Sequence, residues 1–150
     1  MMIFQFRLET SLRISKQMME AAQGVLAEAI RELQKLSEKK SIVNNQYIEV
    51  IERQKKACLR EPHQLNDWQR FSSRQKKQLD ELETLEKEQE ITVAKQREEV
   101  IRLRVEHEKY NKLKEKQYQA FLREELRKEQ KVIDEISQRS AGIKVREVLS

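Results

Sequence analysis

The sequence predicts an all-α fold, a long two-helix antiparallel coiled-coil hairpin. The first observation is composition: 38% of the 150 residues are charged and 37% hydrophobic, with two glycines and one proline, which is typical of long helices. The second is an apolar repeat of alternating three and four residues, which indicates a coiled-coil seam. The third is the position of the single proline, Pro62, near the point where that repeat stops. Together they predict two helical arms and one turn.

The first arm is expected over about residues 6–58. Stepping alternately four and three residues from Leu8 meets apolar side chains at 12 of 15 positions, which predicts one continuous helix with a single buried seam. The three polar exceptions are Ser15, Lys40 and Gln54. Before this arm, Phe4, Phe6 and Leu8 alternate with polar residues at a strand-like period of two.

The turn is expected at residues 59–66, because Pro62 disfavours helical geometry at the residue before it and donates no backbone hydrogen bond. The second arm is expected over about residues 67–141, with Gly142 as its stop and a tail over residues 142–150. Its seam follows the same frame as far as Tyr110. Beyond Tyr110, the apolar repeat is expected to continue in a shifted phase. The residues in this shifted phase include Leu113, Tyr118, Leu122, Leu126, Ile133 and Ile136.

Neither arm can bury its seam alone, so residues 1–150 are expected to form a single antiparallel hairpin. With the turn centred near residue 63, Leu8 should lie near Tyr118, and residues from about 126 to 141 should overhang as a single helix. An overhang that carries Leu126, Val132, Ile133 and Ile136 without an intramolecular partner is a candidate docking surface for another protein.

Several function classes are disfavoured. The net charge is +5, but basic and acidic residues are mixed along the chain, so no nucleic-acid partner is expected. There is no leader-like apolar run near the start and no apolar run long enough for an integral membrane segment, which predicts a soluble cytosolic protein. Cys58 is the only cysteine and is expected to be an inert thiol in a reducing compartment.

The search for a catalytic site is negative. Gly24 and Gly142 are isolated, which excludes a glycine-rich phosphate loop, and His63, His107 and Cys58 are the only metal-ligating candidates besides carboxylates. We expect no enzyme, no cofactor and no metal.

Three segments carry a resemblance to a known family. They are FQFRLETSLR (residues 4–13), WQRF (residues 68–71) and KLKEKQYQAFLREELRKEQKVIDEISQRSA (residues 112–141). With the two-helix plan, they resemble the FliJ family of flagellar type III export proteins over nearly the whole chain, and DEISQR is the most specific part. The resemblance implies a stalk that inserts its paired terminal ends in the hexameric export ATPase, promotes assembly of that ring, contacts the cytoplasmic part of the membrane export gate and hands on export chaperones. It also implies a peripheral location at the cytoplasmic face of the membrane.

Candidate partner-binding residues follow from this resemblance and from the geometry. At the open end, the candidates for the ATPase ring are Phe6, Leu8, Arg13, Asp134, Glu135, Gln138 and Arg139. At the turn end, the candidates for the export gate are Trp68 and Phe71, with closure of the hairpin favoured for Trp68 and exposure for Phe71. The alternatives are that Phe6 and Leu8 only seal the coiled coil and that the charged overhang is simply a solvated helix face.

Two other functions remain open at this level. One is a stalk protein of the same class in an injectisome, although the FRLE opening favours the flagellar system. The other is a generic structural or tethering coiled coil, which would tolerate changes at Arg139 or Phe6.

Overall fold

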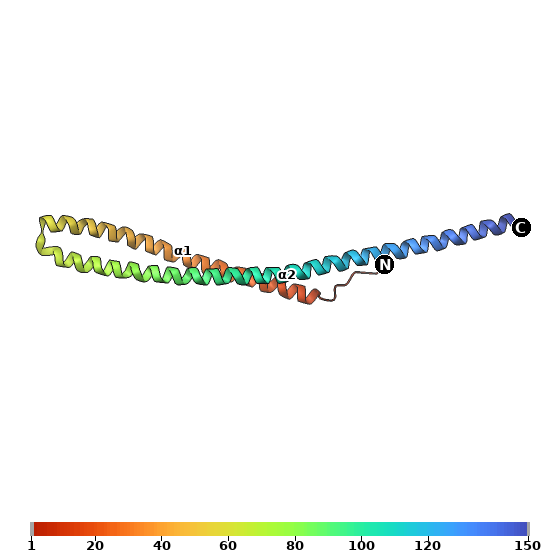
Figure 1. Ribbon diagram of the computed structural model, residues 1–150, viewed down its shortest axis with the longest axis horizontal. Coiled ribbons are helices and arrows are strands. Elements are labelled where there is room, and N and C mark those ends of the chain that lie inside the picture. The colour runs from red at the N-terminus through yellow and green to blue at the C-terminus, as the bar shows by residue number, and fades with distance from the viewer. Residues whose placement is uncertain (1, 150) are drawn as a thin grey trace. The chain divides into compact units, whose positions relative to one another are not determined.

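The computed structural model describes residues 2–149 of the chain, and the side chains of residues 2–143. Helix α1 covers Glu9–Arg60, the short 3-10 helix η1 covers Pro62–Gln64, and helix α2 covers Leu65–Leu149 (Figure 1). Within the described residues there is no β-strand. The predicted all-α helical hairpin is therefore confirmed.

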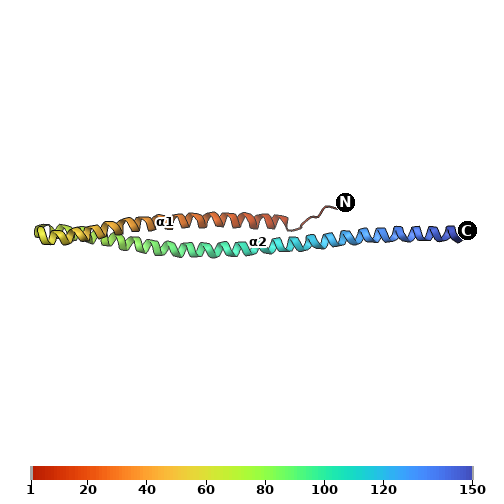
Figure 2. The same ribbon diagram turned by 90° about the horizontal axis from the view of Figure 1, so that it is seen from above.

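The contacts divide the chain into two compact units. We call Met18–Leu103 the hairpin unit, and Met1–Gln17 together with Arg104–Ser150 the terminal unit. The hairpin unit contains the turn, and Figure 2 shows its two helices side by side. The terminal unit contains the first residues of the chain and the last part of α2.

The turn of the hairpin unit is only a few residues long. Glu61 is its one residue outside a helix, with φ −139° and ψ 75°, and its backbone N–H still donates to the carbonyl of Ala57 at 2.7 Å. Pro62 opens η1, where its missing N–H costs nothing and its fixed φ suits the first helical residue. The expected turn near residues 59–66 is confirmed. Its fold-back point is Glu61 rather than residue 63.

The seam of the hairpin unit is built mostly from small and β-branched residues. Ala22, Val100 and Leu103 are each no more than 6% exposed, and Met19 and Leu26 pack against them. All 15 positions of the predicted α1 seam are buried or half-buried, as are the predicted α2 positions as far as Tyr110. The 3.5-residue repeat therefore assigned the inward face of both helices correctly.

Polar residues within this seam mostly find partners. Glu86 pairs with Lys40 at 3.7 Å, and the amide of Gln89 donates to the backbone carbonyl of Ala29 at 3.0 Å. The side-chain oxygens of Gln54 and Gln75 are buried without a hydrogen-bond partner. Because an unsatisfied buried acceptor costs about 1–3 kcal/mol, these two glutamines weaken the seam near the turn.

The ends of the helices differ from expectation at two places. Helix α1 begins at Glu9, so Phe6 lies before the helix rather than in it. Helix α2 continues through Gly142 to Leu149, so the expected stop near Ala141 and the expected tail were wrong as far as residue 149; residue 150 lies outside the described residues. Gly142 has no positive φ, and a glycine within a helix costs only about 1 kcal/mol relative to alanine, which does not end a helix by itself.

Candidate partner-binding surfaces

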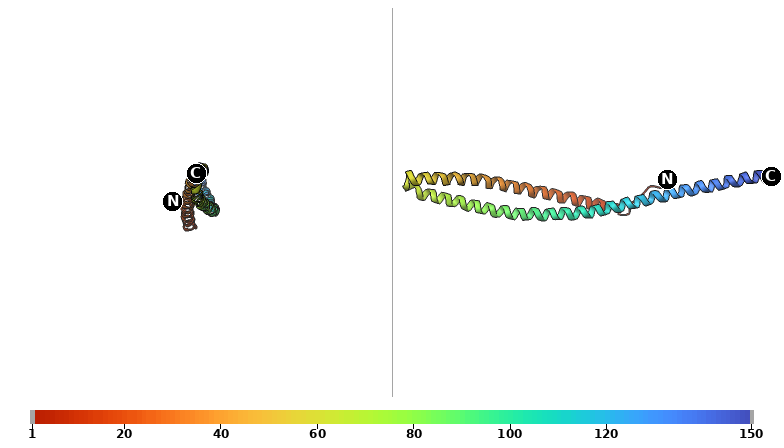
Figure 3. Two further views of the ribbon diagram at one scale, coloured as in Figure 1. Left: turned by 90° about the vertical axis from the view of Figure 1, so that its left-hand side faces the viewer. Right: turned by 45° about the horizontal axis from the view of Figure 1, so that its top comes forward.

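The N-terminal segment of the terminal unit is extended and docks on α2. The ring of Phe4 lies 5.2 Å from the ring of Tyr118, edge to face, and 5.5 Å from the ring of Phe121. Phe6 is 7% exposed, and its carbonyl accepts a hydrogen bond from the backbone N–H of Glu9 at the start of α1. Figure 3 shows the non-helical segment that precedes α1 beside α2. The alternating pattern of residues 4–8 thus provides an apolar anchor that precedes the helix.

The register of this unit is set by three contacts along its length. Ser15 hydrogen-bonds His107, Glu9 forms a 2.8 Å ion pair with Lys114, and Phe4 contacts Tyr118. The expected placement of Leu8 near Tyr118 was wrong by about one helical turn. The error arose because the chain folds back at Glu61 and because Phe4, in an extended segment, reaches the position assigned to a helical residue.

A buried polar layer lies between Ser15 and α2. The hydroxyl of Ser15 donates to the carbonyl of Leu12 at 2.7 Å and lies 3.1 Å from Nδ1 of His107. Since the single hydroxyl proton is used on Leu12, Nδ1–H of His107 must donate to the hydroxyl oxygen, and Nε2 then accepts from the amide of Asn111 at 3.1 Å. This chain of hydrogen bonds gives each ring nitrogen of the inward His107 a partner.

The seam does not change phase beyond Tyr110, contrary to expectation. Lys114 and Phe121 are half-buried and continue the original repeat, whereas Leu113, Tyr118 and Leu122 are 37–42% exposed. Lys114 pairs with Glu9, the first residue of α1, so beyond this point α2 has no helical partner that would bury one apolar face. The later apolar residues consequently do not form a second seam.

The C-terminal part of α2 is exposed and carries the candidate ring-binding residues Asp134, Glu135, Gln138 and Arg139. Among the described side chains, these four make one side-chain hydrogen bond, which the amide of Gln130 donates to Asp134 at 3.1 Å. Apolar side chains on the same helix are more than half exposed: Leu126, Val132, Ile133 and Ile136. Of the other open-end candidates, Arg13 is exposed and Leu8 half-buried.

The turn end presents a smaller apolar surface. Phe71 is 44% exposed, whereas Trp68 is half-buried, which is the division of burial expected from the sequence. Leu59, before the turn, is 86% exposed, and Cys58 is an exposed free thiol. The two expected groups of residues belong to different units: Trp68 and Phe71 to the hairpin unit, and the open-end residues to the terminal unit.

Sequence reasoning missed a charge asymmetry within the terminal unit. Residues 2–17 and 109–123 together hold eight basic and two acidic side chains, a net charge of +6. Because the whole chain carries +5, everything outside these two segments sums to −1. The excess is local, because Glu106 and Glu108 directly precede the second segment and Glu124 and Glu125 directly follow it. The two signs therefore remain mixed along the chain, as expected from the sequence.

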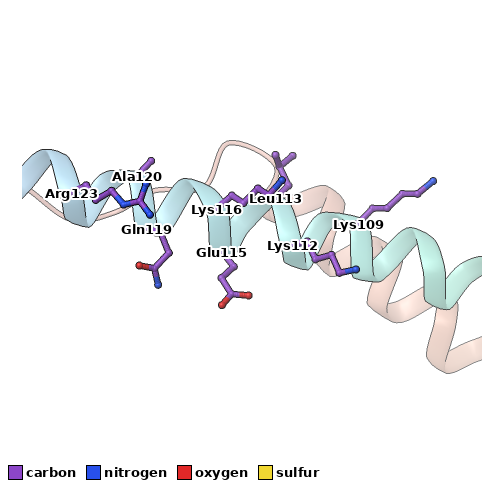
Figure 4. Close-up of a pocket in the computed structure, with 8 residues that line it drawn as sticks. All are labelled: Lys109, Lys112, Leu113, Glu115, Lys116, Gln119, Ala120 and Arg123. Carbon is purple, nitrogen blue, oxygen red and sulfur yellow. The ribbon is translucent and has the colours of Figure 1, made fainter.

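Four of these cations lie along one face of α2, and we call them the basic stripe: Lys109, Lys112, Lys116 and Arg123. Their spacing of three, four and seven residues keeps them on one side of a helix. They line a shallow, open groove with Leu113 and Ala120, and Figure 4 shows Glu115 and Gln119 pointing to the side opposite Leu113. The groove adjoins the docked N-terminal segment, because Ala120 lines both this groove and a second one that includes Ile3 and Phe4.

The described residues show few features of a catalytic or metal-binding site. They contain no cluster of three or more His, Cys, Asp or Glu side chains able to hold a metal ion. No helix among them is long and apolar enough to span a bilayer. One carboxyl group is perturbed: a hydrogen bond from Arg102 lowers the pKa of Glu99, on an exposed face of α2. Such an exposed pair is a surface ion pair rather than a reactive site.

Comparison with known proteins gives one positive finding. The family model described as "Flagellar FliJ protein" matches residues 4–146, which is nearly the whole chain. No curated protein and no solved structure matches. The match includes the extended segment with Phe4 and Phe6, the complete hairpin unit and most of the C-terminal part of α2. The chain therefore belongs to the FliJ family and is related to flagellar protein export.

Proposed function

We propose that this protein is a non-enzymatic stalk of the flagellar export apparatus, which inserts its terminal unit in the hexameric export ATPase and promotes assembly of the ring. The proposal rests on the exposed apolar side chains in the C-terminal part of α2. This part holds four apolar side chains more than half exposed, next to Asp134, Glu135 and Arg139, on a helix without a second helix against it. Such a surface is costly to leave in water and suits insertion into a protein cavity.

The N-terminal segment supports the same role. Phe4 and Phe6 fasten the start of the chain to α2, so the two termini enter a pore together. Arg13 and Arg7 remain exposed, and guanidinium groups pair well with carboxylates or with the carbonyl ends of helices. Leu8 closes the apolar end of the α1 seam, beside the docked segment.

In the hairpin unit, we assign contact with the cytoplasmic part of the export gate to the apolar surface around the turn. Phe71 is the exposed anchor and half-buried Trp68 supports it, since a large aromatic side chain buries much area on binding at a small cost in entropy. In this proposal the protein sits peripherally at the cytoplasmic face of the membrane and hands on empty export chaperones.

The ring contact is tested with the triple variant Asp134→Ala, Glu135→Ala and Arg139→Ala. Affinity for the purified export ATPase is measured by titration, with helical circular dichroism as the check on folding. The matched control is Glu88→Ala, Glu90→Ala and Arg97→Ala, which removes the same charges from exposed positions of the hairpin unit. We expect at least a tenfold loss for the first triple, since charge-assisted contacts contribute about 1.5–3 kcal/mol each when desolvated. Equal affinities of the two triples for the ATPase would contradict the assignment.

The gate contact has its own test. Phe71→Ala should weaken binding to the cytoplasmic domain of the gate by about 1–2 kcal/mol, whereas Leu59→Ala should leave it unchanged. Leu59 is the suitable control because it is also an exposed apolar residue close to the turn, on the other helix. If Leu59→Ala weakened binding to the gate domain more than Phe71→Ala does, the contact would lie on α1 instead.

A further inference from the structure

We propose that the ion pair between Lys40 and Glu86 fixes the register in which the two helices of the hairpin unit pack together. The apolar seam by itself fits more than one alignment of these helices, and this ion pair selects the observed one. The proposal does not rest on the stalk role, because it concerns only how α1 and α2 of the hairpin unit align. A fixed register also decides which residues form the turn, and therefore which apolar side chains are exposed around it.

The buried seam of the hairpin unit repeats itself from one heptad to the next. Its most buried side chains include identical pairs one heptad apart: Ala22 and Ala29, Val43 and Val50, and Val93 and Val100. If α1 slipped along α2 by one heptad, alanine would take the place of alanine, and valine the place of valine. Because volume and shape are kept, packing at these positions would lose little. The apolar repeat thus fixes the buried face of each helix but leaves the register open.

The ion pair is sensitive to such a slip. Lys40 and Glu86 are both seam residues, and the ammonium group of Lys40 lies 3.7 Å from the carboxylate of Glu86 on the other helix. A slip of one heptad would separate the two groups by about 10 Å, at 1.5 Å per residue. The positions that face them would then be held by apolar or aromatic residues: Leu79 or Val93 beside Lys40, and Leu33 or Tyr47 beside Glu86. The side chain of Glu86 is only 18% exposed, so a slip would leave a mostly buried carboxylate without its cation, which is unfavourable.

Other polar contacts of the hairpin unit are much less sensitive to register. Glu49 and Arg53 pair within α1, so their contact would remain after a slip. The amide of Gln89 donates to a backbone carbonyl of α1 at 3.0 Å, and every residue of that helix presents such a group. The contact between Lys40 and Glu86, by contrast, joins two particular side chains and exists in one alignment.

The turn permits a slip in one direction. A slip of one heptad moves the fold-back point along the chain by about half of that shift. Moved towards the C-terminus, the fold-back point would leave Pro62 in the last turn of α1, where proline removes a helical hydrogen bond. Moved towards the N-terminus, it would place Pro62 in the first turn of α2, where proline is tolerated. The alternative register therefore aligns Ala22 with Val93, whereas the observed one gathers Ala22 and Val100 in one buried cluster.

The test traps each register with a disulfide in the whole chain, after Cys58→Ser removes the native thiol. Ala22→Cys with Val100→Cys reports the observed register, and Ala22→Cys with Val93→Cys reports the slipped one, because a disulfide requires Cα atoms within about 7 Å of each other. Each chain is equilibrated in a glutathione buffer, and mass spectrometry measures the intramolecular disulfide. With the ion pair intact, we expect the first cysteine pair to close and the second to stay open.

Replacement of the ion pair gives the decisive comparison. With Lys40→Leu and Glu86→Leu, the slipped disulfide should increase at least about tenfold while circular dichroism stays helical, because leucine suits a seam in either register. The matched control, Lys40→Glu with Glu86→Lys, keeps an ion pair at the same place and should hold the observed register. The proposal would be overturned if the leucine variant formed no more slipped disulfide than the chain with the ion pair intact. It would also be overturned if the control formed as much as the leucine variant.

Discussion

Replacing Phe4 by alanine should release the N-terminal segment from α2 without unfolding the helices. Phe4 makes two aromatic contacts, with Tyr118 at 5.2 Å and with Phe121 at 5.5 Å. At about 0.5–1.5 kcal/mol for each aromatic pair, the change removes about 1–3 kcal/mol from docking. The ratio of docked to undocked segment should therefore fall about 5- to 150-fold.

Limited proteolysis measures this ratio directly. Arg7 lies within the docked segment, between buried Phe6 and half-buried Leu8, so trypsin reaches the bond after it mainly when the segment opens. When opening and closing are faster than cleavage, the cleavage rate follows the open population. Mass spectrometry should therefore detect release of the segment ending at Arg7 at least several-fold faster in Phe4→Ala than in the unchanged chain.

The control is Ile3→Ala. Ile3 is 84% exposed, so its truncation removes almost no buried area and should leave the cleavage rate close to that of the unchanged chain. If Phe4→Ala were cleaved no faster than Ile3→Ala, Phe4 would not hold the segment on α2, and the argument that the termini enter a pore together would fail.

Three further predictions concern stability, measured by urea unfolding followed by helical circular dichroism. Leu103→Ala should cost about 2–4 kcal/mol, because the side chain is buried in the seam, and a loss below about 0.5 kcal/mol would place the core elsewhere. Gln54→Leu with Gln75→Leu should raise stability by about 1–3 kcal/mol by removing two unsatisfied acceptors, and a destabilised double variant would mean that both amides are in fact satisfied. Ser15→Ala should cost about 1–2 kcal/mol, because Nδ1–H of His107 loses its acceptor, and an unchanged midpoint would contradict that tautomer.

The helical hairpin and the inward face of both helices could be predicted from the sequence because one physical signal dominates there. A 3.5-residue apolar repeat fixes which side of each helix is buried, even where the seam includes Lys40, Gln54 or Ser15. The turn could be predicted equally well, because Pro62 restricts the backbone of the residue before it and cannot donate a backbone hydrogen bond.

The sequence was less informative where α2 lacks a partner helix. Leu113 and Leu122 suggested a new phase, but both are exposed. Lys114 instead pairs with Glu9 at the start of α1, and Phe121 contacts Phe4 of the N-terminal segment. Gly142 suggested an end to α2 because glycine often follows a helix, yet its propensity cost is small beside the cooperativity of a long helix.

Only some of the candidate binding residues could be predicted from the sequence. Exposure of Asp134, Glu135, Gln138 and Arg139 follows from an overhang that the helix lengths already predicted. The basic stripe does not stand out in the sequence because glutamates lie within it and at both of its ends: Glu106, Glu108, Glu115, Glu124 and Glu125.

The central claim, that this protein acts as a stalk for the export ATPase, is tested most directly by ATP hydrolysis of the purified ATPase with and without the protein, alongside sizing of the ATPase ring. We expect a higher hydrolysis rate together with a shift of the ATPase towards hexamers, and loss of both effects with the Asp134, Glu135 and Arg139 alanine triple. A well-folded helical protein that changes neither the hydrolysis rate nor the ring size would contradict the claim.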